Sequence, residues 1–134
     1  LEEGSVYLTG VQALVRLPLD QHRLDARNGL RTGTYISGYP GSPLGGYDLA
    51  LQRIKGLLDQ HDVVLQPGAN EELAATSITG TQMLDLHPHQ RFDGVVGLWY
   101  GKGPGVDRSG DAMKHGNFAG TSKHGAVVLP GRGP

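Results

Sequence analysis

Two dense glycine clusters constrain the possible folds of this chain most, because each directly follows a run of β-forming residues. The first, Gly-Tyr-Pro-Gly-Ser-Pro-Leu-Gly-Gly, occupies residues 38–46, and the second lies within residues 97–125 and includes Gly-Lys-Gly-Pro-Gly at 101–105. Glycine is selected where a backbone turns with positive φ or approaches a ligand closely. The 22 glycines among 134 residues exceed what packing needs. The clusters therefore predict either long turning loops or loops that contact a ligand.

Strand-like and helix-like segments alternate along the chain. β-forming runs predict strands at residues 5–9, 32–38, 62–66, 94–100 and 125–129, and the run at 62–66 is typical of a strand covered on both faces. Apolar spacing predicts helices at 10–28, 49–60 and 71–86, with a further helical piece near 109–116. Pro18 predicts a kink or an early stop in the first helix, and Asn70 predicts the N-cap of the third.

This alternation predicts the α/β class, with a mostly parallel sheet and helices on both of its faces. In such sheets, ligands bind beyond the carboxyl ends of the strands. Both glycine clusters and the turn at 67–71 follow predicted strands, so all three should lie at that edge. The sequence therefore predicts a site built there by three segments that are far apart in the chain.

Length, charge and cysteine content exclude several classes of protein. The chain has one domain's length, and its 12 basic and 13 acidic side chains give a net charge of -1. This balance argues against a nucleic-acid module and against a polybasic membrane-surface segment. No apolar run approaches the roughly 20 residues of a spanning helix. Because cysteine is absent from the sequence, these residues hold no disulfide, zinc ribbon or thiolate-bound iron–sulfur cluster.

Glu71 is the first candidate for chemistry, because it comes just after a Pro-Gly turn at the predicted start of a helix. One interpretation is an acid that complements the helix dipole. The other is a carboxylate, buried at the sheet edge, that shares a proton with a nitrogen base. Glu72 fits the dipole role better, since adjacent helical residues point about 100° apart and only one of the two can face the sheet edge.

The glycine clusters do not match known nucleotide-binding motifs. Residues 101–106 lack the third glycine of the dinucleotide fingerprint, and residues 116–123 have the letters of a P-loop in the wrong order. Ser42 and Ser109 lack the Gly-x-Ser-x-Gly turn that exposes a nucleophile. His87 and His89 lack the spacing and companion ligands of a metal pair, so no metal site is predicted.

Three segments carry a resemblance to a known family. They are Ser-Gly-Tyr-Pro-Gly-Ser-Pro-Leu-Gly-Gly (37–46), Gln-Pro-Gly-Ala-Asn-Glu-Glu-Leu-Ala-Ala-Thr (66–76) and Trp-Tyr-Gly-Lys-Gly-Pro-Gly-Val-Asp-Arg-Ser-Gly-Asp (99–111). Together they closely resemble the indolepyruvate ferredoxin oxidoreductase family, in its long fused bacterial form, and Gly-Thr-Ser-Lys-His-Gly at 120–125 fits as well. The likeness covers almost the whole chain, but residues 129–134 depart from it, because an aspartate-bearing turn would be expected there.

The resemblance implies a thiamine-diphosphate-binding fold of the pyrimidine-domain type. Residues 1–134 would then be the N-terminal part of that domain, in a larger multidomain enzyme. The implied reaction is the oxidative decarboxylation of an aryl pyruvate, indolepyruvate, to an acyl-CoA with reduction of ferredoxin. The alternatives are another thiamine-diphosphate-dependent 2-oxoacid oxidoreductase or decarboxylase, and a non-catalytic α/β interaction domain.

The resemblance also implies roles for individual residues. In thiamine enzymes, one glutamate of the pyrimidine domain hydrogen-bonds N1′ of the aminopyrimidine and so promotes loss of the cofactor's C2 proton. The family pattern is a Glu, an Ala three residues later and a Gly nine residues later, which Glu71, Ala74 and Gly80 satisfy. Glu71 is therefore expected to be catalytic and cofactor-binding, with Gly68 and Asn70 beside it as further cofactor-binding residues.

Two other loops are expected to bind the substrate. The loop at 39–43 resembles the Tyr-Pro-x-Thr-Pro loop of related 2-oxoacid oxidoreductases, which places Ser42 and Pro43 against the substrate. Lys102 and Arg108, on the other glycine cluster, could each pair with a 2-oxoacid carboxylate, or could instead form surface or inter-domain ion pairs.

The implied enzyme needs groups that lie outside this chain. Mg²⁺, the [4Fe-4S] clusters and a diphosphate-binding domain are expected on other parts of a cytoplasmic homodimer. Coenzyme A would be the co-substrate and ferredoxin the electron acceptor, with no nucleic acid or membrane as partner. The isolated chain is accordingly expected to be catalytically inactive.

Overall fold

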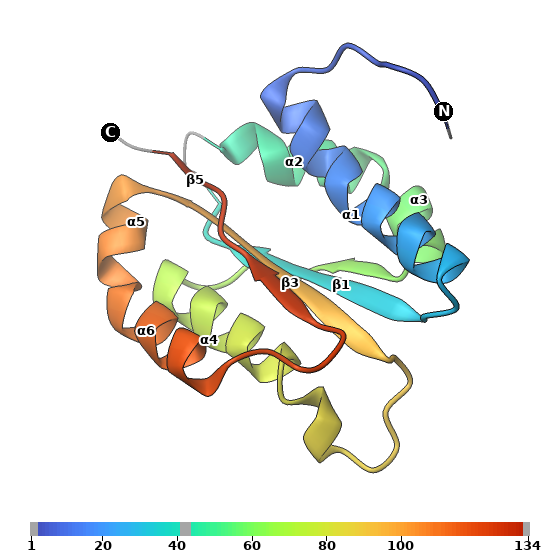
Figure 1. Ribbon diagram of the computed structural model, residues 1–134. Helices are drawn as coiled ribbons and strands as arrows, with labels where there is room; N and C mark the ends of the chain where they lie inside the picture. Colours follow the sequence, from blue (N-terminus) through green and yellow to red (C-terminus); the bar gives the residue numbers. More distant parts are fainter. Residues whose placement is uncertain (1–2, 41–43, 133–134) are drawn as a thin grey trace.

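A four-stranded parallel sheet, in the order β2-β1-β3-β4, forms the centre of the molecule (Figure 1). The computed structural model describes residues 3–40 and 44–132. The strands are β1 (Thr32–Gly38), β2 (Val63–Leu65), β3 (Gly94–Lys102) and β4 (Ala126–Val128), and the short β5 (Gly131–Arg132) pairs in parallel with the end of β3. The predicted α/β class and the parallel sheet are confirmed.

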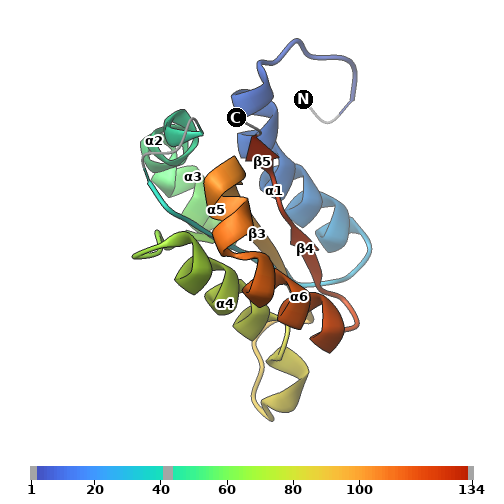
Figure 2. The ribbon, with the colours of Figure 1, turned by 90° about the vertical axis from the view of Figure 1, so that its left-hand side faces the viewer.

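Helices cover both faces of this sheet, as predicted (Figures 1 and 2). One layer contains α1 (Gly10–Arg27), α2 (Gly45–Arg53) and α3 (Lys55–Gln60), and the other contains α4 (Glu71–Thr81), α5 (Gly103–Arg108) and α6 (Gly110–Ala119). A 3-10 turn, η1 (Leu84–Leu86), follows α4. Within the described residues, no helix has both the length and the apolar character that crossing a bilayer requires.

The two central strands bury side chains on both faces, which produces two separate cores. In β3, Leu98 and Tyr100 pack into the core beneath α1 and α2, while Trp99 packs into the core beneath α4. In β1, Ile36 joins the first core and Tyr35 packs against the second. Successive residues of a strand point to opposite faces, so this alternation follows directly from the strand geometry.

Part of the glycine excess serves packing in the core, contrary to the expectation from composition. Residues 97, 99 and 101 share one face of β3, where the large ring of Trp99 lies between two glycines. A Cβ at Gly97 would lie 2.6 Å from Cγ2 of Ile78, and a Cβ at Gly101 would overlap the Trp99 ring. These two glycines therefore make room for α4 and for the indole, not for a ligand.

Of the two outcomes predicted at Pro18, a kink or an early stop, the early stop is wrong, because α1 continues through this residue to Arg27. Proline has no N–H with which to bond the carbonyl four residues earlier. That carbonyl, on Leu14, instead accepts a hydrogen bond from the Tyr47 hydroxyl of α2, at 3.3 Å. A tertiary contact thus occupies the acceptor that the proline leaves free, and Pro18 itself is buried against the sheet.

Other predicted elements also differ from the structure. Residues 5–9 form no strand in the described structure, and Thr9 instead caps α1 through a capping box with Gln12. The helix expected at 49–60 is divided at Ile54 into α2 and α3, and the helix expected at 71–86 ends at Thr81. β2 is an edge strand, so Val64 is 55% exposed and this strand is not covered on both faces.

Gln82, at the end of α4, connects β3 with the neighbouring strand β4. Its side chain is buried, and its Nε2 donates to the carbonyl oxygens of Val95 (2.9 Å) and Ala126 (3.3 Å). Its Oε1 accepts from the amide of Ser122 at 3.4 Å. The side chain therefore bridges β3, β4 and the loop that leads into β4.

We expect Gln82→Met to lower the free energy of unfolding by about 1–3 kcal/mol, because it leaves buried carbonyl and amide groups without partners. Amide hydrogen exchange in β4 should accelerate more than exchange in β1. Gln52→Met, at an exposed position of α2, is the matched control and should change stability by less than about 0.5 kcal/mol. Equal effects of the two substitutions in chemical denaturation would contradict the bridging role.

Candidate functional site

The order of the strands places a topological switch point between β1 and β3. The chain passes from β1 to β2 on one side, and then returns to place β3 on the other side of β1. In open parallel sheets, the crevice beyond the carboxyl ends of two such strands is the usual ligand site. The first glycine cluster follows β1 at this edge, and the second leads from β3 into α5.

The three segments singled out in the sequence meet at this edge, as predicted. The amide of Gly68, in the turn after β2, donates to the carbonyl oxygen of Gly38 at 2.9 Å. Gly38 in turn pairs with Tyr100 across the β1–β3 ladder. The indole Nε1 of Trp99 donates to the backbone carbonyl oxygen of Glu71 at 3.1 Å. Each segment is therefore attached to the next by a specific contact.

The start of α4 is held by its N-cap and by a close turn. The Oδ1 of Asn70 accepts from the amide of Leu73 at 2.8 Å, which confirms the predicted N-cap. A Cβ at Gly68 would lie 2.9 Å from both the Cβ of Ala74 and the carbonyl oxygen of Asn70. The turn therefore requires glycine at 68. The cofactor-binding roles of Gly68 and Asn70 remain predictions.

The two adjacent glutamates at the start of α4 have different surroundings. Glu72 is exposed and forms an ion pair with Arg108 of α5, with 3.7 Å between its Oε1 and the arginine Nε. Glu71 is half-buried, and among the described residues no donor forms a hydrogen bond or ion pair with its carboxylate. Glu71 therefore keeps its acceptor oxygens available for a ligand, whereas Glu72 is engaged within the chain.

The carboxylate of Glu71 rests against α5. A Cβ built on the buried Gly105 would lie 3.0 Å from the Oε1 of Glu71 and 3.2 Å from its Cδ. The side chain of Glu71 thus lies beside the backbone of α5 at Gly105, and the carbonyl oxygen of Glu71 accepts the hydrogen bond from Trp99. This arrangement can accept a hydrogen bond from a ligand nitrogen without losing any contact inside the chain.

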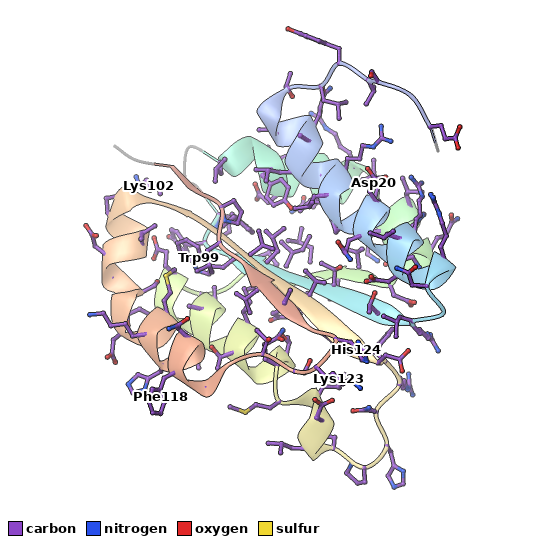
Figure 3. All side chains as sticks on the ribbon, viewed as in Figure 1. Asp20, Trp99, Lys102, Phe118, Lys123 and His124 are labelled. Carbon is purple, nitrogen blue, oxygen red and sulfur yellow. The ribbon has the colours of Figure 1, made fainter. Side chains whose placement is uncertain are left out.

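The predicted substrate residues are not equivalent in the structure. Lys102 ends β3 at the carboxyl edge and is exposed (Figure 3). Among the described residues it has no ion pair, whereas Arg108 is paired with Glu72. Ser42 and Pro43 lie outside the described residues. The assignment of these four residues to substrate binding remains a prediction.

A buried polar cluster of Tyr47, Asp48 and Tyr100, which was not predicted from the sequence, lies near the carboxyl end of β3. Tyr47 of α2 and Tyr100 of β3 pack edge to face, with 5.4 Å between ring centroids. Among the described residues, the Tyr100 hydroxyl and Oδ1 of the buried Asp48 have no hydrogen-bond partner. Burial, and secondly the charge of Asp48, raises the pKa of Tyr100 to about 12. Nothing in the spacing of these residues could have indicated this cluster.

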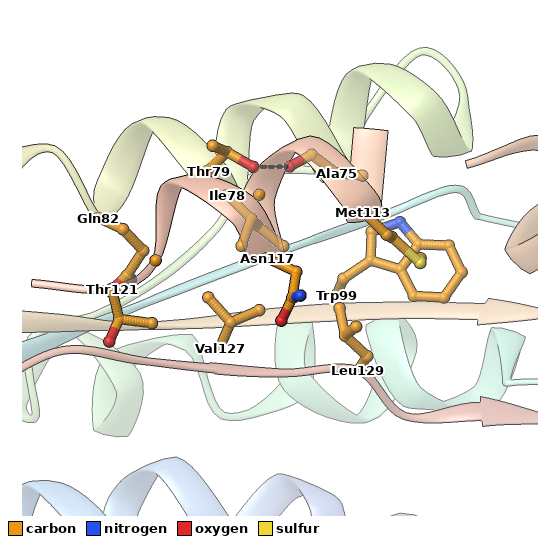
Figure 4. A pocket seen from close by; sticks show the side chains of 12 residues that line it. Ala75, Ile78, Thr79, Gln82, Trp99, Met113, Asn117, Thr121, Val127 and Leu129 are labelled. Carbon is orange, nitrogen blue, oxygen red and sulfur yellow. Dashed lines mark hydrogen bonds between the residues drawn. The ribbon is translucent and has the colours of Figure 1, made fainter. Parts of the chain in front are cut away.

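A cavity of about 240 Å³ lies on the same face of the sheet as Glu71, between α4, α6 and β4 (Figure 4). Trp99, Ile78, Met113 and Val127 provide its apolar walls, and the described residues that line it carry no charge. Within residues 3–40 and 44–132, no group of three or more histidine, aspartate or glutamate side chains could hold a metal ion. This cavity therefore offers no charged side chain for acid–base chemistry among the described residues.

Compared with models of known protein families, with curated proteins and with solved structures, the chain matches none.

The buried tyrosines lead to a stability prediction. We expect Tyr100→Phe to leave the free energy of unfolding unchanged or to raise it by up to about 1 kcal/mol, because it removes a hydroxyl that has no partner within the described residues. Tyr47→Phe should lower it by about 0.5–1.5 kcal/mol, because it removes the bond to Leu14. Chemical denaturation of both variants tests this contrast, and a larger loss for Tyr100→Phe would refute it.

The same pair predicts a loss of stability at alkaline pH. The pKa of Tyr100 rises from 10 to about 12 in the folded chain, and burial followed by the nearby Tyr100 raises that of Tyr47 further. The unfolded chain therefore releases these protons at lower pH than the folded chain, so stability is full below pH 10 and is lost as pH rises towards 12. In a tyrosinate absorbance titration, two of the five tyrosines should titrate only as the chain unfolds.

Proposed function

We propose that this chain is the pyrimidine-binding domain of a thiamine-diphosphate-dependent 2-oxoacid:ferredoxin oxidoreductase, and that Glu71 activates the cofactor. One observation carries the proposal. Of two adjacent glutamates at the switch-point edge, Glu72 is paired with Arg108, whereas Glu71 is half-buried with a carboxylate that no described residue engages. A carboxylate in this state is suited to hold a proton with a heterocyclic nitrogen.

The residues present fit an aminopyrimidine ring at this edge. Glu71 supplies the acceptor, and Gly105 leaves bare backbone beside it where a side chain would strike the carboxylate. Ala74, the second residue of the family pattern, is buried below the turn at Gly68. When bound, thiamine diphosphate supplies the electron sink for decarboxylation. Glu71 would hold a proton at N1′, while Gly68 and Asn70 would border the ring.

Lys102 is a better candidate than Arg108 for the partner of a 2-oxoacid carboxylate. Arg108 already has an anionic partner in Glu72, whereas Lys102 has none among the described residues. A charge-assisted hydrogen bond from the lysine would orient the acid group of indolepyruvate or a related aryl pyruvate. Ser42 and Pro43 belong to the same proposal through the resemblance alone.

The remaining chemistry would lie outside this chain. The 134 residues contain no cysteine, so the [4Fe-4S] clusters that pass electrons to ferredoxin would be bound elsewhere. Mg²⁺ and the diphosphate group would be held by a second domain packed across the Glu71 edge, in a homodimeric enzyme that releases an acyl-CoA. A thiamine-dependent decarboxylase, one of the alternatives, would share the role of Glu71 but lack the cluster-binding domains.

We expect Glu71→Gln in the full-length enzyme to lower kcat by about 10²–10⁴-fold, because it removes the group that shares the proton. Glu72→Gln is the matched control, and it should change kcat by less than about threefold, since it loses only a surface ion pair. Steady-state reduction of ferredoxin with indolepyruvate measures both. Near-wild-type turnover of the Glu71 variant would leave only a helix-dipole or interaction role for this residue.

A second prediction concerns the two cations. Lys102→Gln should raise KM for the 2-oxoacid by about 10–100-fold, because a charge-assisted hydrogen bond is lost. Arg108→Gln should leave KM within about threefold of the wild-type value. Comparing indolepyruvate, phenylpyruvate and branched-chain oxoacids in the same assay identifies the preferred substrate. A larger change in KM for the Arg108 variant would reverse the assignment.

A further inference from the structure

We propose that Gly105 is a positioning residue for Glu71, because the bare backbone of α5 at this glycine sets the direction of the Glu71 carboxylate. The contact between Gly105 and the Glu71 side chain does not depend on a cofactor, but its importance for catalysis rests on the proposed function. Gly105 would not touch substrate or cofactor, and it would act only through Glu71.

The space at Gly105 is too small for a side chain. A Cβ there would lie 2.7 Å from the Cγ of Glu71 and 3.0 Å from its Oε1, and real Cβ atoms essentially never approach below 3.0 Å. The backbone itself does not demand glycine, since positive φ values occur at Gly4, Gly29 and Gly120 but not at Gly105. Glycine fits at this position because the Glu71 side chain occupies the space, and a larger residue would require that side chain to move.

The backbones on either side of this contact are restrained. The carbonyl of Glu71 accepts from the Trp99 indole at 3.1 Å, and the N-cap at Asn70 holds the first turn of α4. The ion pair between Glu72 and Arg108 joins the same two helices. An alanine at 105 would therefore be relieved mainly by rotation of the Glu71 side chain, which would redirect its carboxylate.

Two glycines of the Gly-Lys-Gly-Pro-Gly segment act on Glu71 by separate routes. Gly101 leaves room for the Trp99 ring, whose N–H holds the Glu71 carbonyl, and Gly105 leaves room for the Glu71 carboxylate. The second glycine cluster therefore accommodates both the hydrogen bond to the Glu71 carbonyl and the Glu71 side chain. The sequence predicted turns or a bound ligand at these glycines, whereas in the structure the groups that approach them are side chains of the chain itself.

The first test compares alanine substitutions of two glycines in neighbouring helices. Gly110 begins α6, and a Cβ there would meet nothing within 4 Å, so it is the matched control. Gly110→Ala should leave Tm unchanged or raise it slightly, because a helical alanine loses less backbone entropy than glycine. Gly105→Ala should lower Tm by about 2–5 °C, because the Glu71 side chain must leave its preferred rotamer to relieve the overlap.

The same substitution in a chain that carries Glu71→Ala tests whether the decrease in Tm is caused by Glu71. In a Glu71→Ala chain, Gly105→Ala should no longer lower Tm, because the atoms that it would strike are gone. An equal loss in both backgrounds would overturn the proposal, and so would a Gly105→Ala chain as stable as the wild type. If Gly105→Ala alone fails to fold, a folded double variant still supports the contact, and an unfolded one overturns it.

The orientation of the carboxylate has its own readout. Trp99 is the single tryptophan of the chain, so its indole N–H resonance reports on the Glu71 carbonyl without overlap. Gly105→Ala should shift the Glu71 side-chain carboxyl carbon resonance, with a smaller change at the indole, and Gly110→Ala should move neither. An unshifted Glu71 resonance would overturn the proposal. Full activity of Glu71→Gln would instead overturn the proposed function and leave this contact standing.

Discussion

The structure depends on the packing of one indole. Trp99 is fully buried beneath α4, with its ring in the space that Gly101 leaves open on the same strand, while Gly97 lets α4 approach the strand beside it. Its ring completes the second core, and its N–H holds the carbonyl of Glu71. The same side chain therefore stabilises the sheet-to-helix contact and places the first residue of α4. The position of the candidate site is thus coupled to the stability of the core.

The ion pair between Arg108 and Glu72 distinguishes the two adjacent glutamates of α4, which have similar positions in the sequence. Glu71 and Glu72 are adjacent, and either could complement the helix dipole. Arg108 pairs with Glu72 on the exposed side of α4, which leaves Glu71 directed against α5 without a cationic partner among the described residues. The arginine therefore contributes to the site by engaging the neighbouring carboxylate, and the proposed reaction needs only the carboxylate that remains.

Local sequence signals were enough to predict some elements and failed for others that depend on distant residues. The bounds of β1 and the cap at Asn70 were predicted correctly, because β-forming residues and capping chemistry act within a few residues. Pro18 did not stop α1, since a tyrosine from another helix satisfies the freed carbonyl. The role of Gly105 and the pairing of Arg108 were equally hidden, because both depend on how α5 packs against α4.

The central claim is that Glu71, and not Glu72, meets the cofactor. A structure of the proposed full-length enzyme, determined with thiamine diphosphate, tests it most directly. We expect a Glu71 carboxylate oxygen within about 2.6–3.2 Å of N1′ of the aminopyrimidine, with Glu72 still paired to Arg108. A cofactor whose N1′ faces Glu72, or that lies away from the β1–β3 edge, would contradict this account.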